Sequence, residues 1–386
     1  MNDSYDVVVI GGGAAGLSGA LMLARSRRSV VVIDAGSPRN APADGVHGLL
    51  ARDGTPPREL VAQGRAEVVG YGGEIVDGVV VGVDRIDGDG QVIPAEPLDG
   101  VESLGSAVAG RTDAAGRDGA VDRVVVADRV EAAGLADAVD RRGAGVLAGV
   151  GDSYVFRVSL ADGRTVRARR VLVTTGLTDV LPEIPGLREH WGHDVLHCPY
   201  CHGWEVRDRR IAVLASGPMS VHQALLFSQL SDDVVFLTHT ASAPAEEDAE
   251  KLTARGIRIV DGEVVEVRST GDRLAGVRLA DGTVLDRDAL VVAPRASIRA
   301  DFLTGLGLPA QPHPAGIGDH LPADPVGRTT VPGVWVAGNV TDPSAQVGAA
   351  AAAGAMAGAQ INAELVMTET TAAVAARRAA SAAVLS

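Results

Sequence analysis

Residues 5–16 read YDVVVIGGGAAG, a short β-branched run followed by a glycine-rich turn. The apolar residues after the turn predict a helix, and Asp34 stands at the end of the next β-branched run. This is the G-x-G-x-x-G fingerprint in its strand–turn–helix context. Gly11 permits the tight turn, Gly13 lets the backbone approach a pyrophosphate, and Gly16 lets the helix and the strand pack closely. The fingerprint predicts a dinucleotide site with Asp34 on a ribose, and by itself it does not distinguish FAD from NAD.

The composition narrows both the fold and the partners. Hydrophobic residues make up 46% of the 386 residues and aromatic residues only 3%, so the core must consist mainly of aliphatic side chains. Such a core suits buried parallel sheets packed against helices. A net charge of −14 would repel a phosphate backbone, which argues against a nucleic-acid partner. The apolar run near the N-terminus is broken by glycines, unlike a signal peptide or a membrane span, so we expect a cytoplasmic protein without a membrane partner.

The remainder of the chain shows an interruption and then a second unit. Residues 87–150 are rich in Gly, Asp and Ala and hold no strand or helix period for long, apart from a helical spacing at 128–142. We interpret this stretch as an insertion. The elements predicted after it are a hairpin at 154–160 and 165–174, strands at 210–214 and 234–237 around a helix, and a buried strand at 334–337. An Ala-rich helix at 347–365 follows, with a tail of frayed helix beyond 368.

The two cysteines of the chain, Cys198 and Cys201, stand three residues apart. At this spacing they share one face of a first helical turn. Pro199 suits an early helical position, because no intrahelical donor is needed there. The positive end of the helix would favour the thiolate form of Cys198, which disulfide exchange requires. The pattern therefore predicts a redox-active dithiol/disulfide pair.

Three other interpretations of the cysteine pair remain open. Two structural cysteines could fall together by chance. A zinc site could include some of the nearby histidines His190, His193, His197 and His202, although no second C-x-x-C is present. Residues 198–202 also match C-x-x-C-H, the attachment signal of c-type haem, which is normally used outside the cytosol. Neither metal nor haem explains the glycine fingerprint.

Three separated segments resemble the low-molecular-weight thioredoxin-reductase-type flavoproteins: the fingerprint, the strand end VTTG at 173–176, and VWVAGNVTD at 334–342. The resemblance implies an α/β fold with two doubly wound Rossmann-like domains, FAD as the cofactor and a homodimer. The central domain would keep a degenerate nucleotide-binding fold. The implied boundaries are 1–184 and 295–367 for a discontinuous FAD domain that contains the insertion, 185–294 for the cysteine-bearing domain, and 368–386 for an Ala-rich tail.

By the same resemblance, several short segments would contact the flavin. The late segment of the family usually contains Gly-Asp, whereas Gly338 is followed here by Asn339, whose amide can still donate and accept hydrogen bonds. Gln346 and Val347 open the last helix and would face the pyrimidine side of the isoalloxazine. The complete set of expected FAD-binding residues is Gly11, Gly13, Ala14, Ala15, Gly16, Asp34, Ala35, Arg39, Asn40, His47, Val80, Thr175, Gly176, Gly338, Asn339, Gln346 and Val347.

The resemblance also implies roles for the residues around the cysteines. Cys201 would face the flavin, and Cys198 would exchange with the sulfur of the substrate. His202 stands where the family commonly has an acidic proton donor, and a histidine can both accept and deliver a thiol proton near neutrality. His197 is a second candidate. For each histidine, a purely structural hydrogen bond is the alternative.

The second glycine fingerprint that an NADPH-using reductase needs is missing. Residues 213–220 read VLASGPMS, in which Gly217 alone remains and Pro218 removes a backbone donor. Residues 238–240 read THT, where paired basic residues would otherwise grip a 2′-phosphate. The sequence therefore predicts that the second unit keeps its fold and has lost the nucleotide.

Without NADPH, electrons would enter from a dithiol through the cysteines and leave to O2. The chain resembles the FAD-dependent dithiol oxidases that close disulfides in natural products of secondary metabolism, which share its His-Cys-x-x-Cys segment. It is predicted to oxidise a small-molecule dithiol to a disulfide, with FAD reoxidised by O2 to give H2O2. One alternative is a thioredoxin-reductase-type disulfide reductase that uses NADPH or ferredoxin. A second is a flavoprotein redox sensor or metal-binding module.

Overall fold

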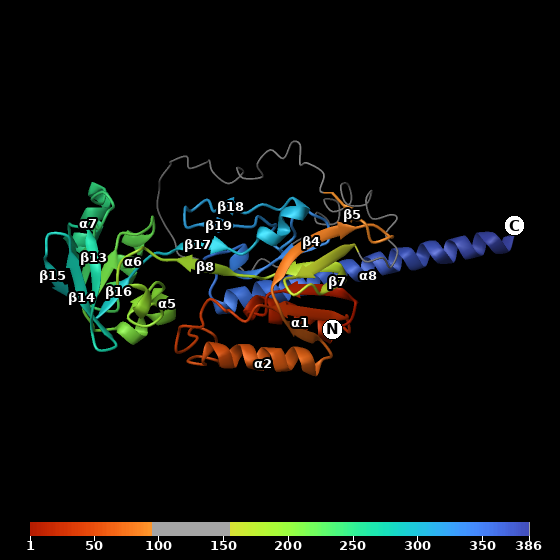
Figure 1. Ribbon diagram of the computed structural model, residues 1–386, viewed down its shortest axis with the longest axis horizontal. Helices are drawn as coiled ribbons and strands as arrows, with labels where there is room; N and C mark the ends of the chain where they lie inside the picture. The colour runs from red at the N-terminus through yellow and green to blue at the C-terminus, as the bar shows by residue number, and fades with distance from the viewer. Residues whose placement is uncertain (95–154, 386) are drawn as a thin grey trace, which may run out of the picture.

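A computed structural model describes residues 1–94 and 155–385, which form two α/β bodies joined by a thin ribbon (Figure 1). The larger body is built on an eight-stranded sheet in the order β3-β2-β1-β7-β6-β4-β5, with β20 paired to β7. The strands β1, β2, β3, β7 and β20 pair in parallel, and β4, β5 and β6 form an antiparallel extension. The bounds are β1 (Ser4–Ile10), β2 (Val30–Asp34), β3 (Glu74–Asp77), β4 (Val80–Ile86), β5 (Val92–Ile93), β6 (Phe156–Leu160), β7 (Thr165–Val173) and β20 (Val334–Val336).

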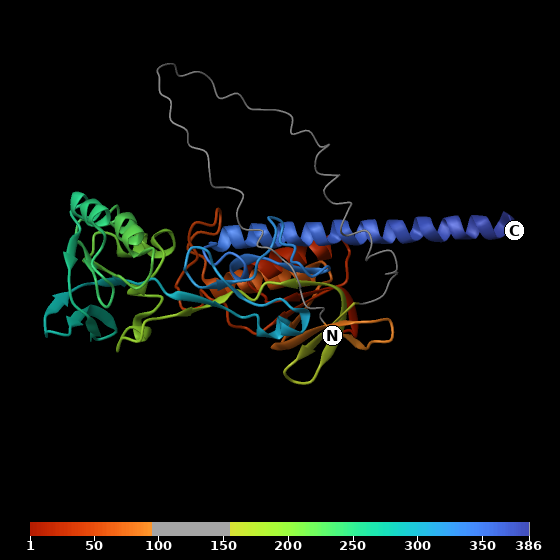
Figure 2. The ribbon, with the colours of Figure 1, turned by 90° about the horizontal axis from the view of Figure 1, so that it is seen from above.

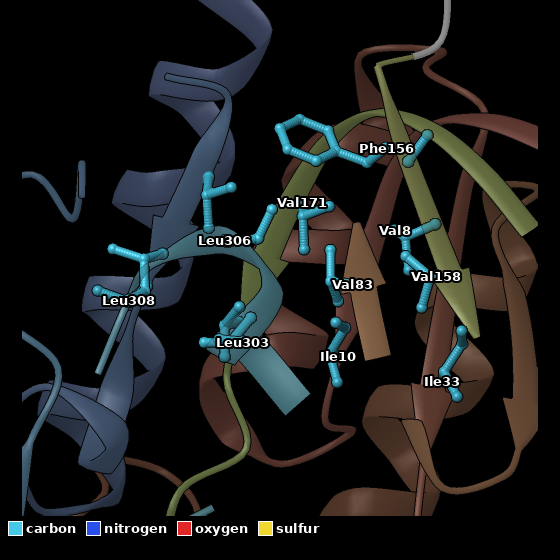
Figure 3. Packing of buried hydrophobic residues seen from close by; sticks show 14 of the residues in the cluster. Val8, Ile10, Ile33, Val83, Phe156, Val158, Val171, Leu303, Leu306 and Leu308 are labelled. Atoms are coloured by element: carbon cyan, nitrogen blue, oxygen red, sulfur yellow. The ribbon is translucent and has the colours of Figure 1, made fainter. Parts of the chain in front are cut away.

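Both faces of this sheet are buried, as the continuous aliphatic run of β1 predicts. Val8 and Ile10 pack on one face with β4, β6 and the 3-10 helix η3 (Asp301–Leu306), as Figure 3 shows. Val7 and Val9 point to the other face, where the helices α1 (Ala14–Arg25), α2 (Pro57–Gly70) and α8 (Val347–Leu385) contribute to the core. The alternation of β1 therefore divides the core of the larger body between the two faces of the sheet.

The smaller body carries a five-stranded parallel sheet in the order β12-β11-β10-β16-β9 and a three-stranded antiparallel sheet, β13-β14-β15. The ribbon between the bodies is the antiparallel pair β8 and β17. The bounds are β8 (Leu177–Val180), η1 (Arg188–His190), β9 (Val195–Leu196), α5 (Pro199–His202), η2 (Trp204–Val206), β10 (Ile211–Leu214), α6 (Ser220–Phe227), β11 (Val234–Leu237), α7 (Glu246–Ala254), β12 (Arg258–Val260), β13 (Val264–Thr270), β14 (Arg273–Leu279), β15 (Val284–Asp286), β16 (Ala289–Val291) and β17 (Arg295–Ile298). The chain then returns to the larger body, with β18 (Gln311–Pro312), β19 (Asp319–His320) and η4 (Gly338–Val340) (Figure 1).

The predicted α/β fold with two Rossmann-like sheets is confirmed, as are the hairpin of β6 and β7 and the strand–helix–strand unit β10–α6–β11. The last helix begins at Val347 as predicted, but the tail expected as frayed helix continues it without a break to Leu385 and extends beyond the body (Figure 2). This extension contains no Gly or Pro and many alanines, which are the strongest helix formers. The helix predicted at 128–142, and residues 95–150 of the predicted insertion, lie outside the described residues.

None of the helices in the described part of the chain has the length and the hydropathy that a membrane crossing requires. The 39-residue α8 is included in that statement.

Ion pairs fasten α8 to the sheet just before the helix leaves the body. One oxygen of Glu369 accepts from Arg28 Nη1 at 2.5 Å and from Arg169 Nη1 at 2.6 Å. Arg28, more than Arg169, lowers the pKa of Glu369 from 4.5 to about 2. Because the folded-state pKa lies below the unfolded value, the stabilisation is complete above about pH 4.5 and is lost as the pH falls towards 2.

We expect Glu369→Gln to lower the free energy of unfolding by about 1 kcal/mol at pH 7, since partial exposure of this carboxylate screens the ion pairs. The difference from the wild type should shrink as the pH falls from 4.5 towards 2. Denaturant unfolding followed by circular dichroism at several pH values measures it. Glu247→Gln removes an exposed partner of Lys251 and is the matched control, with an expected change near zero. A difference that stays constant down to pH 3 would contradict the proposed role of Glu369.

Candidate active site

The turn between β1 and α1 forms one wall of a deep cavity. Gly11 has a φ of +107°, and a Cβ on this residue would lie 2.5 Å from the carbonyl oxygen of Thr174. A Cβ on Gly16 would collide with the carbonyl oxygen of Gly11, so helix and strand pack as closely as the fingerprint predicts. The Cβ position of Gly13 has no described atom within 4 Å. The backbone at Gly13 is therefore open to a ligand at the N-terminus of α1.

Asp34, at the end of β2, lies beside this turn. Its Oδ1 accepts a hydrogen bond from the backbone N–H of Gly12 at 3.1 Å. Its Oδ2 lies 3.1 Å from Nη1 of Arg65 on α2, and Nη2 of Arg65 donates to Asp77 at 2.6 Å. These contacts hold the carboxylate against the cavity wall. The sequence could not predict this role of Arg65, because α2 and β2 come together only in the folded protein.

The cavity has a volume of about 600 Å³ and runs from the glycine turn to the cysteine pair. Most of the residues predicted for the cofactor or for catalysis line it. They are Gly11, Gly13, Ala14, Ala15, Asp34, Ala35, Arg39, Asn40, Val80, Thr175, Gly176, His197, Cys198, Cys201, His202, Asn339, Gln346 and Val347. Of the predicted set, Gly16, His47 and Gly338 lie outside its wall. Residues that the sequence reasoning missed include Asp179, Trp191, Arg299 and Phe302.

Arg39 lines the cavity, and its guanidinium is already engaged by the protein. Nε and Nη2 donate to the two oxygens of Asp179 at 2.8 and 2.7 Å, and Nη1 donates to the carbonyl oxygen of Pro343 at 3.3 Å. Asp179 belongs to β8, in the ribbon between the two bodies. Arg39 therefore fixes the loop after β2 against the ribbon and against the segment before α8.

Asn339 organises the segment that leads into α8. Its Nδ2 donates to the carbonyl oxygens of Asp342, Pro343 and Ala345 at 3.0, 3.4 and 2.8 Å. An aspartate at this position could not donate to these three carbonyl oxygens and would repel them. The three contacts therefore explain why the side chain here is an amide and not a carboxylate. Through this contact Asn339 positions Gln346 at the cavity wall.

His47 is not among the residues that line the cavity. Its Nδ1 is 3.4 Å from the carboxylate of Asp53, and its Nε2 is 3.5 Å from Oε1 of Glu205. His47 therefore contacts two carboxylates, and its predicted contact with the flavin stays a prediction. Sequence spacing could not show this, because Glu205 belongs to the other body of the fold.

Cys198 and Cys201 form a disulfide with a Cα–Cα distance of 5.2 Å. Cys198 is the N-cap of the one-turn helix α5, where its sulfur accepts the backbone N–H of Cys201 at 3.2 Å, and Pro199 occupies the first helical position. Both cysteines are half-buried and line the cavity that begins at the glycine turn. The structure thus brings the disulfide and the dinucleotide fingerprint into one cavity.

His202 follows Cys201 at the end of α5 and lines the same cavity. Its Nε2 is buried and has no hydrogen-bond partner among the described residues. Burial lowers the pKa of His202 below 6.5, and the nearby Glu205 carboxylate partly opposes the shift. The imidazole is therefore neutral at pH 7, with a ring nitrogen free for a proton from a ligand.

His197 precedes the disulfide and is held by α6. Gln223 Nε2 lies 2.9 Å from His197 Nδ1 and 2.9 Å from the carbonyl oxygen of His197. Burial, and then the positive charge of Arg39, lower the pKa of His197. His197 is thus a neutral side chain whose Nδ1 is occupied.

In the smaller body, the backbone N–H groups that follow strand β10 are hydrogen-bonded within the protein. The backbone N–H groups of Ser216 and Gly217, between β10 and α6, both donate to Oγ of Ser220 at 3.2 Å. Ser220 is buried, and Oγ of Ser216 accepts from the N–H of Ala293 at 2.8 Å. In a nucleotide-binding unit these N–H groups would face a phosphate.

The histidines near the cysteines do not converge. His190 is buried against Oγ of Ser269 at 2.7 Å, whereas His193 is exposed beside Asp44 at 3.9 Å. Across residues 1–94 and 155–385, no three His, Cys, Asp or Glu side chains are grouped so that they could hold a metal ion. The geometry therefore offers no support for the zinc interpretation.

The fold and the cavity define a Rossmann-type redox enzyme with a disulfide next to its dinucleotide site. Residues 5–359 match the family model described as pyridine nucleotide-disulphide oxidoreductase, and the chain belongs to this family. It is 27% identical over 371 residues to "Thioredoxin reductase sirT" of Leptosphaeria maculans, covering 93% of each chain. It is 27% identical over 341 residues to "Thioredoxin reductase tcpT" of Claviceps purpurea, covering 86% of each chain.

Solved structures agree with this assignment. The crystal structure of HlmI is similar to this chain with a TM-score of 0.76 and 37% identity, covering 100% of this chain and 98% of that one. An oxidoreductase from Agrobacterium tumefaciens is similar with a TM-score of 0.72 and 30% identity, covering 94% and 99%. The protein is therefore an FAD-dependent oxidoreductase that acts on disulfides.

The residues of the cavity fit FAD. The open backbone at Gly13 and the N-terminus of α1 suit the pyrophosphate, and Asp34 suits a ribose hydroxyl. At the other end of the cavity, Gln346 and Val347 open α8, and the positive end of that helix suits the electron-rich part of a reduced flavin. The disulfide shares this cavity, within reach of the same ligand.

Proposed function

We propose that the protein is an FAD-dependent dithiol oxidase that closes a disulfide in a small-molecule dithiol. The dithiol gives up two electrons and two protons and becomes a disulfide, and O2 accepts them and becomes H2O2. The observation that carries the proposal is the pair of N–H groups capped by Ser220, because it leaves the family's second dinucleotide site without a phosphate cradle.

The cysteine pair would transfer the electrons. A substrate thiolate attacks Sγ of Cys198, which breaks the enzyme disulfide and releases Cys201 as a thiolate. The second substrate thiol then attacks the mixed disulfide, so that the product leaves as a disulfide and both cysteines are reduced. Bound FAD supplies the two-electron acceptor that reoxidises the pair and passes the electrons to O2.

His202 is proposed as the proton acceptor of these thiol steps. Its neutral imidazole, and its buried Nε2 without a hydrogen-bond partner among the described residues, allow it to take the proton that a substrate thiol loses on becoming a nucleophile. It can return the proton to a cysteine sulfur when the mixed disulfide is resolved.

A disulfide reductase fed by NADPH is the second candidate, favoured by the names of the relatives in Leptosphaeria maculans and Claviceps purpurea. Three features oppose it. Pro218 has no N–H, Ser220 caps the two N–H groups beside it, and residues 238–240 lack the basic side chains that would bind a 2′-phosphate.

Anaerobic mixing separates the two candidates. The purified protein is mixed with NADPH, or with a small dithiol such as dithiothreitol, while the flavin absorbance is recorded. We expect bleaching by the dithiol and none by NADPH, followed by recovery of the oxidised spectrum and one H2O2 per flavin when air is admitted. Rapid bleaching by NADPH would refute the oxidase proposal and support the reductase.

We further propose, from the resemblance to the thioredoxin-reductase type, that the protein is a cytoplasmic homodimer. Analytical ultracentrifugation of the full chain should give twice the 39.4 kDa chain mass. A single species at the chain mass would contradict the dimer.

A further inference from the structure

Gln223 is a buried amide on α6 that touches the histidine preceding the disulfide. Its side chain is 4% exposed. Its Nε2 lies 2.9 Å from both the Nδ1 and the carbonyl oxygen of His197, whereas its Oε1 is buried without a hydrogen-bond partner among the described residues. A buried unpaired amide oxygen costs stability, so this arrangement calls for a reason.

The carbonyl oxygen of His197 fixes the orientation of the amide. If the amide were reversed, Oε1 would stand 2.9 Å from that oxygen, and two acceptors would face each other. The NH2 group of Gln223 must therefore face His197. It presents a hydrogen to Nδ1, which has to be the unprotonated, accepting nitrogen of the ring.

One contact competes with this assignment. The carbonyl oxygen of Val292 lies 3.2 Å from His197 Nδ1 and would accept from that nitrogen if it carried a proton. A proton there would lie beside the NH2 group of Gln223, whose nitrogen is closer to Nδ1, at 2.9 Å. With a proton on Nδ1, two donors would face each other at 2.9 Å, Nδ1 and the NH2 group of Gln223. Without it, two lone pairs face each other at 3.2 Å, those of Nδ1 and of the Val292 carbonyl oxygen. The first repulsion is the stronger, because its distance is shorter. The Gln223 contact therefore decides the tautomer.

The remaining ring nitrogen, Nε2, is the one available to a ligand. His197 lines the FAD cavity in company with Arg39 and Asp179, and its Nδ1 is occupied by α6. Burial and Arg39 keep the ring neutral. With Nδ1 unprotonated, the proton of a neutral imidazole resides on Nε2.

We propose that Gln223 is a positioning residue that holds His197 as the neutral Nε2–H tautomer, so that this N–H donates a hydrogen bond to the isoalloxazine. Reduction increases the electron density of the flavin, so a donor favours the reduced form. The inference rests on the FAD cavity and not on the direction in which electrons flow. It also removes His197 from the proton-transfer role and leaves that role to His202.

Nitrogen-15 NMR of the histidines tests the tautomer directly. In protein labelled at the histidine ring nitrogens, the signals assigned by their absence in His197→Gln should show a protonated Nε2 and an unprotonated Nδ1 across pH 6–8. Gln223→Glu replaces the NH2 group by an acceptor and should move a proton to Nδ1. His222→Gln, on the exposed neighbouring position of α6, should leave the His197 signals unchanged. A wild-type spectrum with the proton on Nδ1 overturns the proposal, and His197→Gln is the one variant that this measurement needs, for the assignment of the signals.

The flavin potential gives a second, independent measurement. Gln223→Leu and His197→Leu should each reduce the preference of the protein for reduced over oxidised FAD by about tenfold, which for a two-electron couple lowers the midpoint potential by about 30 mV. His197→Gln, which can keep an N–H donor near the same place, should restore most of the shift. An unchanged potential in His197→Leu with FAD bound would also overturn the proposal. If the purified wild-type protein did not bind FAD, the assignment of the cavity to FAD would be refuted. Bleaching of the flavin by NADPH would refute only the proposed oxidase function.

Discussion

Cys201→Ser is expected to bind FAD and to lose at least about a thousandfold in dithiol oxidation, because the sulfur that passes electrons to the flavin is gone. The cysteine pair and the glycine turn line one cavity, but FAD would be held mainly by the larger body. Loss of one sulfur should therefore spare the cofactor. The measurements are flavin content by absorbance, anaerobic bleaching by a dithiol, and H2O2 production in air.

Two further variants make this test specific. Cys198→Ser should also abolish turnover, since no sulfur remains for the substrate thiolate to attack. Tyr200→Phe, an exposed position between the two cysteines, should retain turnover. If Cys201→Ser kept the wild-type rate, Cys201 would have no part in the mechanism. If it lost FAD as well, the pair would have a structural role in the cavity.

His202→Gln is expected to slow bleaching of the flavin by a dithiol about 10²- to 10⁴-fold at pH 7, the usual contribution of a positioned proton acceptor. Burial holds the pKa of His202 below 6.5, so the neutral, accepting form persists as the pH falls to 6.5. In the wild type the bleaching rate should therefore fall only below pH 6.5, as the ring becomes protonated. In the variant this acid limb should disappear, and the rate should instead rise with the thiolate fraction of the substrate, towards about pH 8.5.

Stopped-flow bleaching from pH 5 to 9 measures both profiles. His222→Gln is the matched control, because His222 is exposed on α6, lies outside the cavity wall and is not among the charges that shift the pKa of His202, and it should keep the wild-type profile. An acid limb that survives in His202→Gln would assign the titration to another group. Equal bleaching rates of the wild type and His202→Gln at pH 7 would refute the role of His202, and another group would then have to be the proton acceptor.

The central motifs of this protein are local, which is why the sequence was sufficient to predict them. The glycine turn needs only a preceding strand and a following helix, and its glycines are dictated by contacts such as that of Gly11 with Thr174. The cysteine pair likewise depends on one helical turn, and Pro199 stands where the sequence places it. Family resemblance added FAD and the two-sheet architecture, both of which are confirmed.

The full length of helix α8 could not be predicted from the sequence pattern. The packed part was predicted to end at residue 365 and a frayed helical tail to follow beyond 368, whereas α8 runs unbroken to Leu385, since periodicity identifies the face that packs and not the point where a good helix former stops. The ion pairs of Glu369 with Arg28 and Arg169 lie beyond that predicted end. Each joins residues more than 190 positions apart, a separation over which sequence pattern carries no signal.

What the sequence by itself determined, then, is the chemistry: a dinucleotide fold, a redox disulfide and a second unit without its glycine fingerprint. What only the tertiary structure decided is how each polar side chain is used. Arg39 binds Asp179, His47 meets Glu205, Ser220 caps two N–H groups, and Gln223 orients His197. The physical reason is that a motif is specified by neighbours along the chain, whereas a buried hydrogen bond is specified by whatever donor or acceptor folding brings within about 3 Å.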